Sequence, residues 1–250
     1  MIRIENVHHE LGGQPVLNGI DLVVPRGGVT ALIGPNGAGK STLLSLVARL
    51  ARLQRGRITV DDLTVGQCDE RTLARHLAIM PQSTEVAARL RVGDLVGFGR
   101  YPWCGGRPGP ADHEIAARSI ARLGLAPLAD RFLDEISGGQ RQRALVAMAH
   151  AQDTPYLLLD EPLNNLDIAA ARSLMTLLRD MARTDGKTIV IVLHDINFAA
   201  AFADRIIAMK SGRVVADGTP DEVVRPSLLS DVFGTDAGIA RVEGRPVVLV

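Results

Sequence analysis

The stretch of this chain best suited to chemistry is Gly34-Pro35-Asn36-Gly37-Ala38-Gly39-Lys40-Ser41-Thr42. It fits G-x-x-x-x-G-K-[ST], a pattern whose backbone N–H groups cradle nucleotide phosphates. We expect the glycines to let the backbone approach phosphate oxygens that a side chain would keep away. Lys40 should reach the β- and γ-phosphates, and the Ser41 hydroxyl should bind Mg²⁺. The alternative, a glycine turn before an ordinary helix, accounts for less of the pattern.

Two adjacent carboxylates follow the apolar run Tyr156–Leu159. Successive strand residues point to opposite sides, so Asp160 and Glu161 should have different roles. We expect Asp160 to hold the hydration shell of Mg²⁺. Glu161 should face the γ-phosphate and polarise a water as a general base. A solvated strand end would explain the carboxylates equally well by themselves, and it is the phosphate loop upstream that favours a functional role.

Two single residues at the ends of apolar runs are weaker candidates. Gln82 follows Pro81, where its amide could touch Mg²⁺ or the attacking water, although a surface turn is the usual explanation of such a residue. His194 ends the run Thr188–Leu193, and it could donate a hydrogen bond to the γ-phosphate. Most histidines at strand ends are structural, so both assignments need support from elsewhere in the chain. Asp195 is expected to cap the next helix.

A second anion site is predicted at Ser137-Gly138-Gly139-Gln140, which opens a helix carrying Arg141 and Arg143. The N-terminus of a helix attracts negative charge through its free N–H groups and its dipole. A capped helix after a flexible turn is the simpler explanation. However, one nucleotide has a single triphosphate, so a chain with two predicted anion sites, the phosphate loop and this helix start, requires an explanation.

The elements that must position these residues indicate an α/β protein with a mostly parallel sheet. Residues 1–30 should form antiparallel strands with turns at 12–13 and 25–28, and a helix should follow the phosphate loop to about Arg52. A helical insertion, 85–154, should interrupt a nucleotide-binding core made of 1–84 and 155–250, all within one domain. The other expected helices are Val92–Gly99, Asp112–Leu123, Gln140–Gln152, Ile168–Thr184, Thr219–Val224 and Ser227–Phe233; the other expected strands are Val29–Ile33, Gly56–Asp61, Leu77–Met80, Tyr156–Leu159, Thr188–Leu193, Ile206–Met209 with Val214–Ala216, and Arg241-Val242 with Pro246–Val250; and Pro102–Pro110 is expected to be a loop.

Composition limits the classes of function. The 28 basic residues balance 28 acidic ones and aromatic residues make up 3%, which argues against nucleic acid as a partner. Cys68 and Cys104 lie far apart without metal-ligand spacing, as expected in a reducing compartment. No apolar run approaches the ~20 residues of a membrane helix, and the N-terminus has no apolar signal core. If this protein works at a membrane, another chain should supply the spans.

The order of the motifs resembles that of the ATP-binding subunits of ABC transporters, over nearly the whole chain. Gly34–Thr42 resembles their Walker A motif, Gln82 their Q-loop, Leu157–Glu161 their Walker B motif, Asn165–Asp167 their D-loop and His194 their switch histidine. Ile136–Gln140 resembles their signature, with Ile in place of the usual Leu. The resemblance implies a P-loop NTPase core of the RecA-like type with an N-terminal antiparallel β subdomain, and it implies that ATP and Mg²⁺ are bound.

The resemblance also explains the two anion sites. In this family two copies pair head to tail, and each ATP lies between the Walker A motif of one and the signature of the other. Ser137, Gly138, Gly139 and Gln140 would then contact the γ-phosphate of a partner's ATP, with Asp167 nearby. Within each chain Glu161, His194, Lys40 and Gln82 would be catalytic, and Ser41, Gln82 and Asp160 would hold the metal.

Two stretches resemble a narrower branch, the ATPases of bacterial iron-siderophore importers, with haem and cobalamin importers as close relatives. They are Gly97–Pro102 and Glu161–Asp167, the second together with Leu193–Asn197. The resemblance implies a permease partner, an indirect link to a substrate-binding protein and a place on the cytoplasmic face of the inner membrane. Tyr101 and Trp103 would lie on the permease-facing side, or be ordinary packing residues. The alternatives are a soluble ABC-type remodelling ATPase, for which one cassette and zero net charge are atypical, and an unrelated P-loop kinase, which has no use for the signature.

One position departs from the family pattern. Where an aromatic residue usually stacks on adenine, the alignment places Leu11, which offers apolar contact without a π-face. His9 is a candidate substitute. We therefore expect only modest discrimination between ATP and GTP. Residues 234–250 show no pattern that indicates chemistry.

Overall fold

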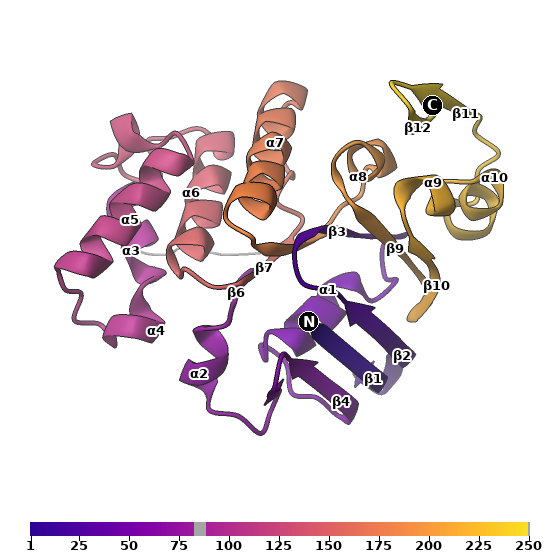
Figure 1. Cartoon of the computed structure of the whole chain (residues 1–250), viewed down its shortest axis with the longest axis horizontal. Helices are drawn as coiled ribbons and strands as arrows, with labels where there is room; N and C mark the ends of the chain where they lie inside the picture. Colours follow the sequence, from indigo (N-terminus) through magenta and orange to yellow (C-terminus); the bar gives the residue numbers. More distant parts are fainter. Residues whose placement is uncertain (83–88, 250) are drawn as a thin grey trace.

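The computed structural model describes residues 1–82 and 89–249. A six-stranded sheet in the order β10-β9-β3-β8-β7-β6 forms its centre, and every neighbouring pair in it is parallel except β9 with β10. A four-stranded antiparallel sheet, β2-β1-β4-β5, lies beside it, and β11 and β12 form a separate hairpin (Figure 1). The expected α/β fold with a mostly parallel sheet and an N-terminal antiparallel layer is confirmed. The strands are β1 Ile2–Leu11, β2 Gln14–Val24, β3 Gly28–Ile33, β4 Arg55–Val60, β5 Leu63–Thr64, β6 Leu77–Met80, β7 Tyr156–Asp160, β8 Thr188–Val192, β9 Arg205–Lys210, β10 Arg213–Gly218, β11 Ile239–Val242 and β12 Arg245–Val248.

Helices cover both faces of the central sheet, and those of residues 92–151 gather at one end of the molecule (Figure 1). Among them α6 packs against both α3 and α5. The helices are α1 Lys40–Val47, α2 Glu70–Ala74, α3 Val92–Phe98, α4 Tyr101–Cys104, α5 Pro110–Arg122, η1 Ala126–Leu128, α6 Gly138–Ala151, α7 Ile168–Thr184, α8 Ile196–Phe202, α9 Pro220–Val223, α10 Pro226–Leu228 and η2 Leu229–Phe233.

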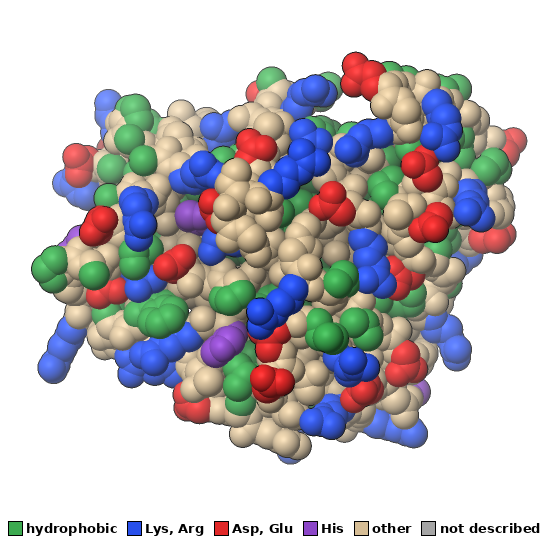
Figure 2. Space-filling model, in the orientation of Figure 1, with side chains coloured by type: hydrophobic (Ala, Val, Ile, Leu, Met, Phe, Trp, Pro, Cys, Tyr) green, Lys and Arg blue, Asp and Glu red, His purple; other side chains and the backbone are tan. Residues whose placement is uncertain are grey.

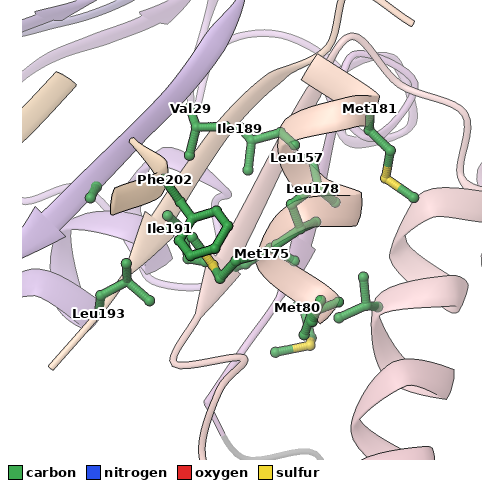
Figure 3. Close-up of a cluster of buried hydrophobic side chains, with 14 of the residues drawn as sticks. Val29, Met80, Leu157, Met175, Leu178, Met181, Ile189, Ile191, Leu193 and Phe202 are labelled. Carbon is green, nitrogen blue, oxygen red and sulfur yellow. The ribbon is translucent and has the colours of Figure 1, made fainter. Parts of the chain in front are cut away.

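The central strands are buried on both faces, which is why they read as continuous apolar runs. Alternate residues of β3 belong to different cores: Val29 and Ala31 pack on the α7 side, and Leu32 packs on the α1 side. On the α7 side the sheet meets Met175, Leu178 and Met181 of that helix (Figure 3). This double burial fixes the register of the strands, because a shift by one residue would exchange the two faces.

The structure differs from the sequence expectations at several elements. Helix α1 ends at Val47 instead of continuing to about Arg52, because the backbone turns left-handed at Arg49, with φ 59°. Helix α4, Tyr101–Cys104, overlaps the start of the expected loop Pro102–Pro110, and α2, η1 and β5 were not expected. The expected boundary between residues 84 and 85, and Val250 of the last expected strand, lie outside the described residues.

The charged side chains on the surface and the length of the helices bear on the expectations from composition. On the face drawn in Figure 2, basic and acidic side chains are interspersed, and hydrophobic side chains lie over α4. Within residues 1–82 and 89–249 no helix combines the length and the apolar character that crossing a bilayer requires.

Candidate functional site

The carboxyl ends of four parallel strands meet at one edge of the central sheet, and each is followed by a candidate residue. Gly34 follows β3, Glu161 follows β7, Gln82 comes two residues after β6, and His194 comes two residues after β8. Residues up to 160 positions apart in the chain, Gly34 and His194, are therefore brought to one place by strand pairing alone.

The loop between β3 and α1 has the conformation of a phosphate cradle. Gly34, Gly37 and Gly39 have φ of 144°, 78° and 97°, a range that glycine adopts without the cost of a Cβ. The Lys40 side chain folds over this loop, and its ammonium donates to the carbonyl oxygens of Gly34 (2.8 Å) and Pro35 (3.0 Å). Burial lowers the pKa of Lys40. The partly desolvated Lys40 ammonium is therefore positioned to exchange these carbonyl oxygens for the oxygens of a phosphate anion.

Two of these glycines are required by packing rather than by phosphate approach, which changes the reason expected from the sequence. A Cβ at Gly34 would run into the carbonyl oxygen of Met209 in β9, and one at Gly39 would lie 2.6 Å from Cδ2 of Leu17. A Cβ at Gly37 meets nothing within 4 Å. Only Gly37 thus leaves open space in front of the loop.

Ser41 and Asp160 form a hydroxyl–carboxylate pair at the start of α1. The Ser41 hydroxyl donates to Oδ1 of Asp160 at 2.9 Å. Burial raises the pKa of Asp160, which is 4% exposed. Oxygen ligands of this kind suit Mg²⁺, and a buried carboxylate gains from a cation that replaces its lost water. The pair therefore fits a magnesium ion held beside the phosphate loop.

Glu161 is the centre of the polar site. Its Oε2 accepts from Gln82 Nε2 (2.7 Å) and Asn164 Nδ2 (2.6 Å), and its Oε1 lies 2.6 Å from His194 Nε2. Burial alone would raise the pKa of Glu161, but hydrogen bonds from Asn164 and His194 outweigh it and hold that pKa below its usual value. Glu161 is therefore a charged, 8% exposed carboxylate fixed from three directions.

The backbone at Glu161 explains why it faces this centre. Its φ is 53°, in the left-handed region that non-glycine residues rarely adopt. The chain leaves β7 at this point and turns, which brings Asn164 back to Glu161 through a hydrogen bond from Asn164 N to Glu161 O at 3.2 Å. Asn164 was missed as a site residue, although it lies in the stretch Glu161–Asp167 that drew attention in the sequence. A polar residue three positions after a carboxylate that ends a strand was the available signal.

The predicted anion site at Ser137–Gln140 is a helix start with its own internal cap. The Ser137 hydroxyl accepts from Gln140 N (3.2 Å), and the Gln140 side chain accepts from Ser137 N (2.9 Å). A Cβ at Gly139 would lie 3.2 Å from Leu166, so this helix start adjoins the segment before α7. Asp167 caps α7 by accepting from Ala170 N at 2.7 Å. Within the described residues of this one chain, no hydrogen bond joins Ser137–Gln140 to the phosphate loop.

The expected adenine position lies at the exposed end of β1. Leu11 is 56% exposed beside the turn at Gly12 and Gly13. His9 is 4% exposed, so its ring is buried, and among the described residues its Nδ1 has no hydrogen-bond partner. His9 therefore presents no face for a base to stack on, and Leu11 is the only one of the two at the surface.

Comparisons with known proteins agree with this geometry. Residues 17–164 match the family described as ABC transporter. The chain is 45% identical to the petrobactin import ATP-binding protein FatE of Bacillus anthracis over 249 residues, which is 100% of both chains. It is 37% identical to the hemin import ATP-binding protein HmuV of Shewanella denitrificans, again over 100% of both.

Two solved structures share the fold. One belongs to a protein described as a metal-chelate type ABC transporter in an inward-facing conformation, with a TM-score of 0.85, 26% identity, and 99% and 96% of the two chains covered. The other is the bacterial ABC transporter cassette MJ0796, which was solved as a dimer and also with ADP and Pi bound. Its TM-score is 0.78 at 28% identity, with 88% and 98% covered.

Proposed function

The chain belongs to the ABC transporter family of ATP-binding proteins, and we propose that it powers a bacterial importer of ferric siderophores by hydrolysing ATP between two copies of itself. It is an ATPase, as its family membership shows. The observation that carries the proposal is the convergence of Gln82, Asn164 and His194 on Glu161, next to the phosphate loop and the Ser41–Asp160 pair.

Binding of ATP uses the loop Gly34–Thr42. Its backbone N–H groups and the N-terminus of α1 receive the phosphates. Lys40 exchanges the carbonyls of Gly34 and Pro35 for the β- and γ-phosphate oxygens, a stronger partnership because the phosphates are charged. Ser41 and Asp160, with Gln82, hold Mg²⁺, which would neutralise charge on the phosphates when bound.

Glu161 acts as the general base. An ionised carboxylate has about four lone-pair sites, and three donors already occupy three of them. The remaining site accepts a hydrogen bond from the attacking water and orients it toward the γ-phosphate. Because the three donors keep Glu161 charged, it is ready to take the proton of the water near neutral pH. His194 is placed to contact the γ-phosphate from the neighbouring strand end.

The second copy completes the site. Ser137–Gln140 start a helix of 14 residues, whose dipole and N–H groups favour added negative charge. Among the described residues no hydrogen bond joins Ser137–Gln140 to the phosphate loop of the same chain, and we infer that the γ-phosphate they would bind is that of a partner copy. A related cassette forms a dimer, which supports this arrangement. Loss of the γ-phosphate on hydrolysis removes the tie, and the two copies separate.

A permease is the proposed membrane partner, because exposed hydrophobic side chains mark one face of the helical region. Phe98, Tyr101 and Trp103 are 55%, 65% and 38% exposed, and a groove of about 550 Å³ runs beside α3, α4 and α5. An exposed apolar surface with a groove suits a helical segment of another protein. We place the chain on the cytoplasmic face of the inner membrane, attached through the permease, with a substrate-binding protein serving the same importer.

The cargo is inferred from the relatives. FatE is a petrobactin importer protein, whereas HmuV imports hemin. Petrobactin import proteins are 45% and 41% identical to this chain, and hemin import proteins are 42% and 37% identical, so the comparison ranks a siderophore first and haem second by a small margin, with cobalamin third. Uptake of a radiolabelled ferric siderophore, of radiolabelled haem and of radiolabelled cobalamin, each measured separately in cells lacking this chain, separates these cargoes. A defect confined to haem would overturn the siderophore assignment.

The hydrolytic proposal is tested by Glu161→Gln. This change keeps the shape of the side chain and removes the base. We expect ATP binding to persist, turnover to drop by about 10²–10⁴, and the copies to remain together with ATP in size-exclusion chromatography. Turnover near the original rate would remove Glu161 from the mechanism, and a monomer in saturating ATP would contradict the paired site.

A further inference from the structure

The helix that carries the His194 loop is too short to hold itself in place. Helix α8 has seven residues and begins two positions after His194. Its N-cap, Asp195, accepts hydrogen bonds from the backbone N–H groups of Asn197 (2.7 Å) and Phe198 (3.3 Å). Helices of this length are unstable without tertiary contacts. The orientation of His194 therefore depends on what packs against α8.

The hairpin β11–β12 is the element fastened to α8 by side-chain hydrogen bonds at both ends. At the first turn, Asn197 Nδ2 donates to Val248 O (3.0 Å) and Asn197 Oδ1 accepts from Val248 N (2.8 Å). The side-chain amide thus takes the place of a neighbouring strand along the outer edge of β12. At the last turn, Arg245 Nη1 donates to Ala200 O (3.1 Å) and also to Ala201 O.

These two contacts complement the helix electrically as well as geometrically. The last carbonyls of a helix lack partners within it and carry partial negative charge. The Arg245 guanidinium satisfies two of them from β12. Asn197 connects the hairpin to the His194 loop. Its side chain is hydrogen-bonded to Val248, and its backbone N–H donates to the carboxylate of Asp195, the residue next to His194.

Among the described residues, one other polar side-chain contact joins the hairpin to the rest of the fold, and it is weak. Arg241 of β11 pairs with Asp221 of α9 at 2.8 Å, but the two side chains are 64% and 53% exposed. Exposed ion pairs of this kind contribute little to stability. The hairpin also forms a sheet of its own, separate from the two larger sheets. Its contact with α8 is therefore its principal polar contact with the rest of the fold.

We propose that Asn197 and Arg245 are positioning residues for catalysis: they clamp α8 to the C-terminal hairpin and so hold His194 on Glu161. The inference rests on the role proposed for His194. The 2.6 Å contact between His194 Nε2 and Glu161 Oε1 requires placement within a fraction of an ångström, and a shift of about 1 Å in a catalytic group costs up to ~10²-fold in rate. Residues 234–250, which showed no chemistry in the sequence, thereby acquire a function.

The test compares four substitutions in the full chain. Arg245→Ala removes the clamp, Arg245→Lys retains a cation that reaches the same carbonyls, and Arg241→Ala removes the matched arginine of the same hairpin without touching α8. We expect kcat for ATP hydrolysis to fall about tenfold in Arg245→Ala, with KM for ATP within about twofold of the original. Arg245→Lys should recover most of the rate, and Arg241→Ala should keep all of it. Asn197→Ala should behave as Arg245→Ala does.

A spectroscopic measurement distinguishes positioning from a general loss of stability. The imidazole ¹⁵N signal of His194, assigned by its loss in His194→Gln, should shift in Arg245→Ala and stay in place in Arg241→Ala. An unchanged signal and an unchanged kcat in folded Arg245→Ala would overturn the inference. If Arg245→Ala does not fold, Arg245→Lys and Asn197→Ala decide it by the same two measurements. If His194→Gln itself hydrolyses ATP at the full rate, the proposed role of His194 fails instead.

Discussion

Asn164 offers the sharpest test of the polar centre, because the sequence did not single it out as a site residue. Its side-chain amide donates to Glu161 Oε2 at 2.6 Å, and Glu161 is 8% exposed. A hydrogen bond to a charged group contributes about 1.5–3 kcal/mol. Since 1.4 kcal/mol corresponds to a factor of ten, complete loss of this bond would slow the reaction by about 10- to 100-fold.

Asn164→Ala should reach the lower end of that range. Gln82 and His194 still hold Glu161 after the substitution, so the carboxylate retains part of its orientation. We expect kcat to fall about tenfold while ATP still binds. Thr176→Ala is a suitable control, because it removes a 2.9 Å hydrogen bond that stays within α7, on an exposed part of that helix.

The pH dependence gives a second, independent readout. Asn164 is the strongest of the groups that lower the pKa of Glu161, acting against burial. Its removal should therefore raise the pKa of Glu161, and the acid limb of the kcat profile should move to higher pH. Steady-state hydrolysis measured from below the usual glutamate pKa of about 4.3 up to neutral pH records both effects. An unchanged kcat together with an unchanged acid limb would refute the assignment of Asn164 to the centre.

Three further predictions concern the glycines of the phosphate loop, the ion pair at Asp61 and the recognition of adenine. Gly34→Ala should abolish folding because its Cβ would meet the Met209 carbonyl, whereas Gly37→Ala, which faces open space at φ 78°, should fold and lose about 1–2 kcal/mol in urea unfolding; equal losses would contradict the packing argument. Asp61, held at 2.5 Å from the N-terminal ammonium and from the Tyr156 hydroxyl, has a pKa lowered by Arg26, the N-terminus and Tyr156 against the effect of burial. The charged Asp61 should therefore stabilise the fold above the unfolded pKa of about 3.9, and this stabilisation should fade as the pH falls through the folded pKa. The Tm of Asp61→Asn should lie about 4 °C or more below that of the original chain at pH 7, and the difference should narrow in acid. A Tm difference that does not change with pH would contradict this prediction. Competitive binding should show modest preference for ATP over GTP, and Leu11→Tyr should increase it by adding a π-face, while a strong preference in the original chain would contradict the assignment of Leu11.

The fold and the positions of most candidate residues were predictable because each of these residues lies within two positions of the end of an apolar run. A buried parallel strand reads as such a run, and its carboxyl end lies at the same edge as those of its neighbours. The positions of Gly34, Gln82, Glu161 and His194 at one edge followed from this rule. This prediction requires no knowledge of distances in the structure, because the pairing of parallel strands brings their carboxyl ends together.

What the sequence could not supply depends on backbone turns and on distant contacts. Asn164 reaches Glu161 because the backbone at Glu161 is left-handed, a conformation that a glutamate in the sequence does not predict. The burial of His9 depends on the bulges of β1, which shift its register against β2. Asn197 meets Val248, 51 positions away, through a hairpin that has no sequence motif of its own.

The paired site is tested most directly by mixing two inactive variants. Ser137→Arg blocks the helix start that acts on a partner's ATP, and Lys40→Ala disables the phosphate loop of its own chain. If each ATP lies between two copies, a mixed pair contains one intact site, formed by Lys40 of the first variant and Ser137 of the second. Hydrolysis should then return when the two inactive proteins are combined. A mixture as inactive as its components would contradict the shared site.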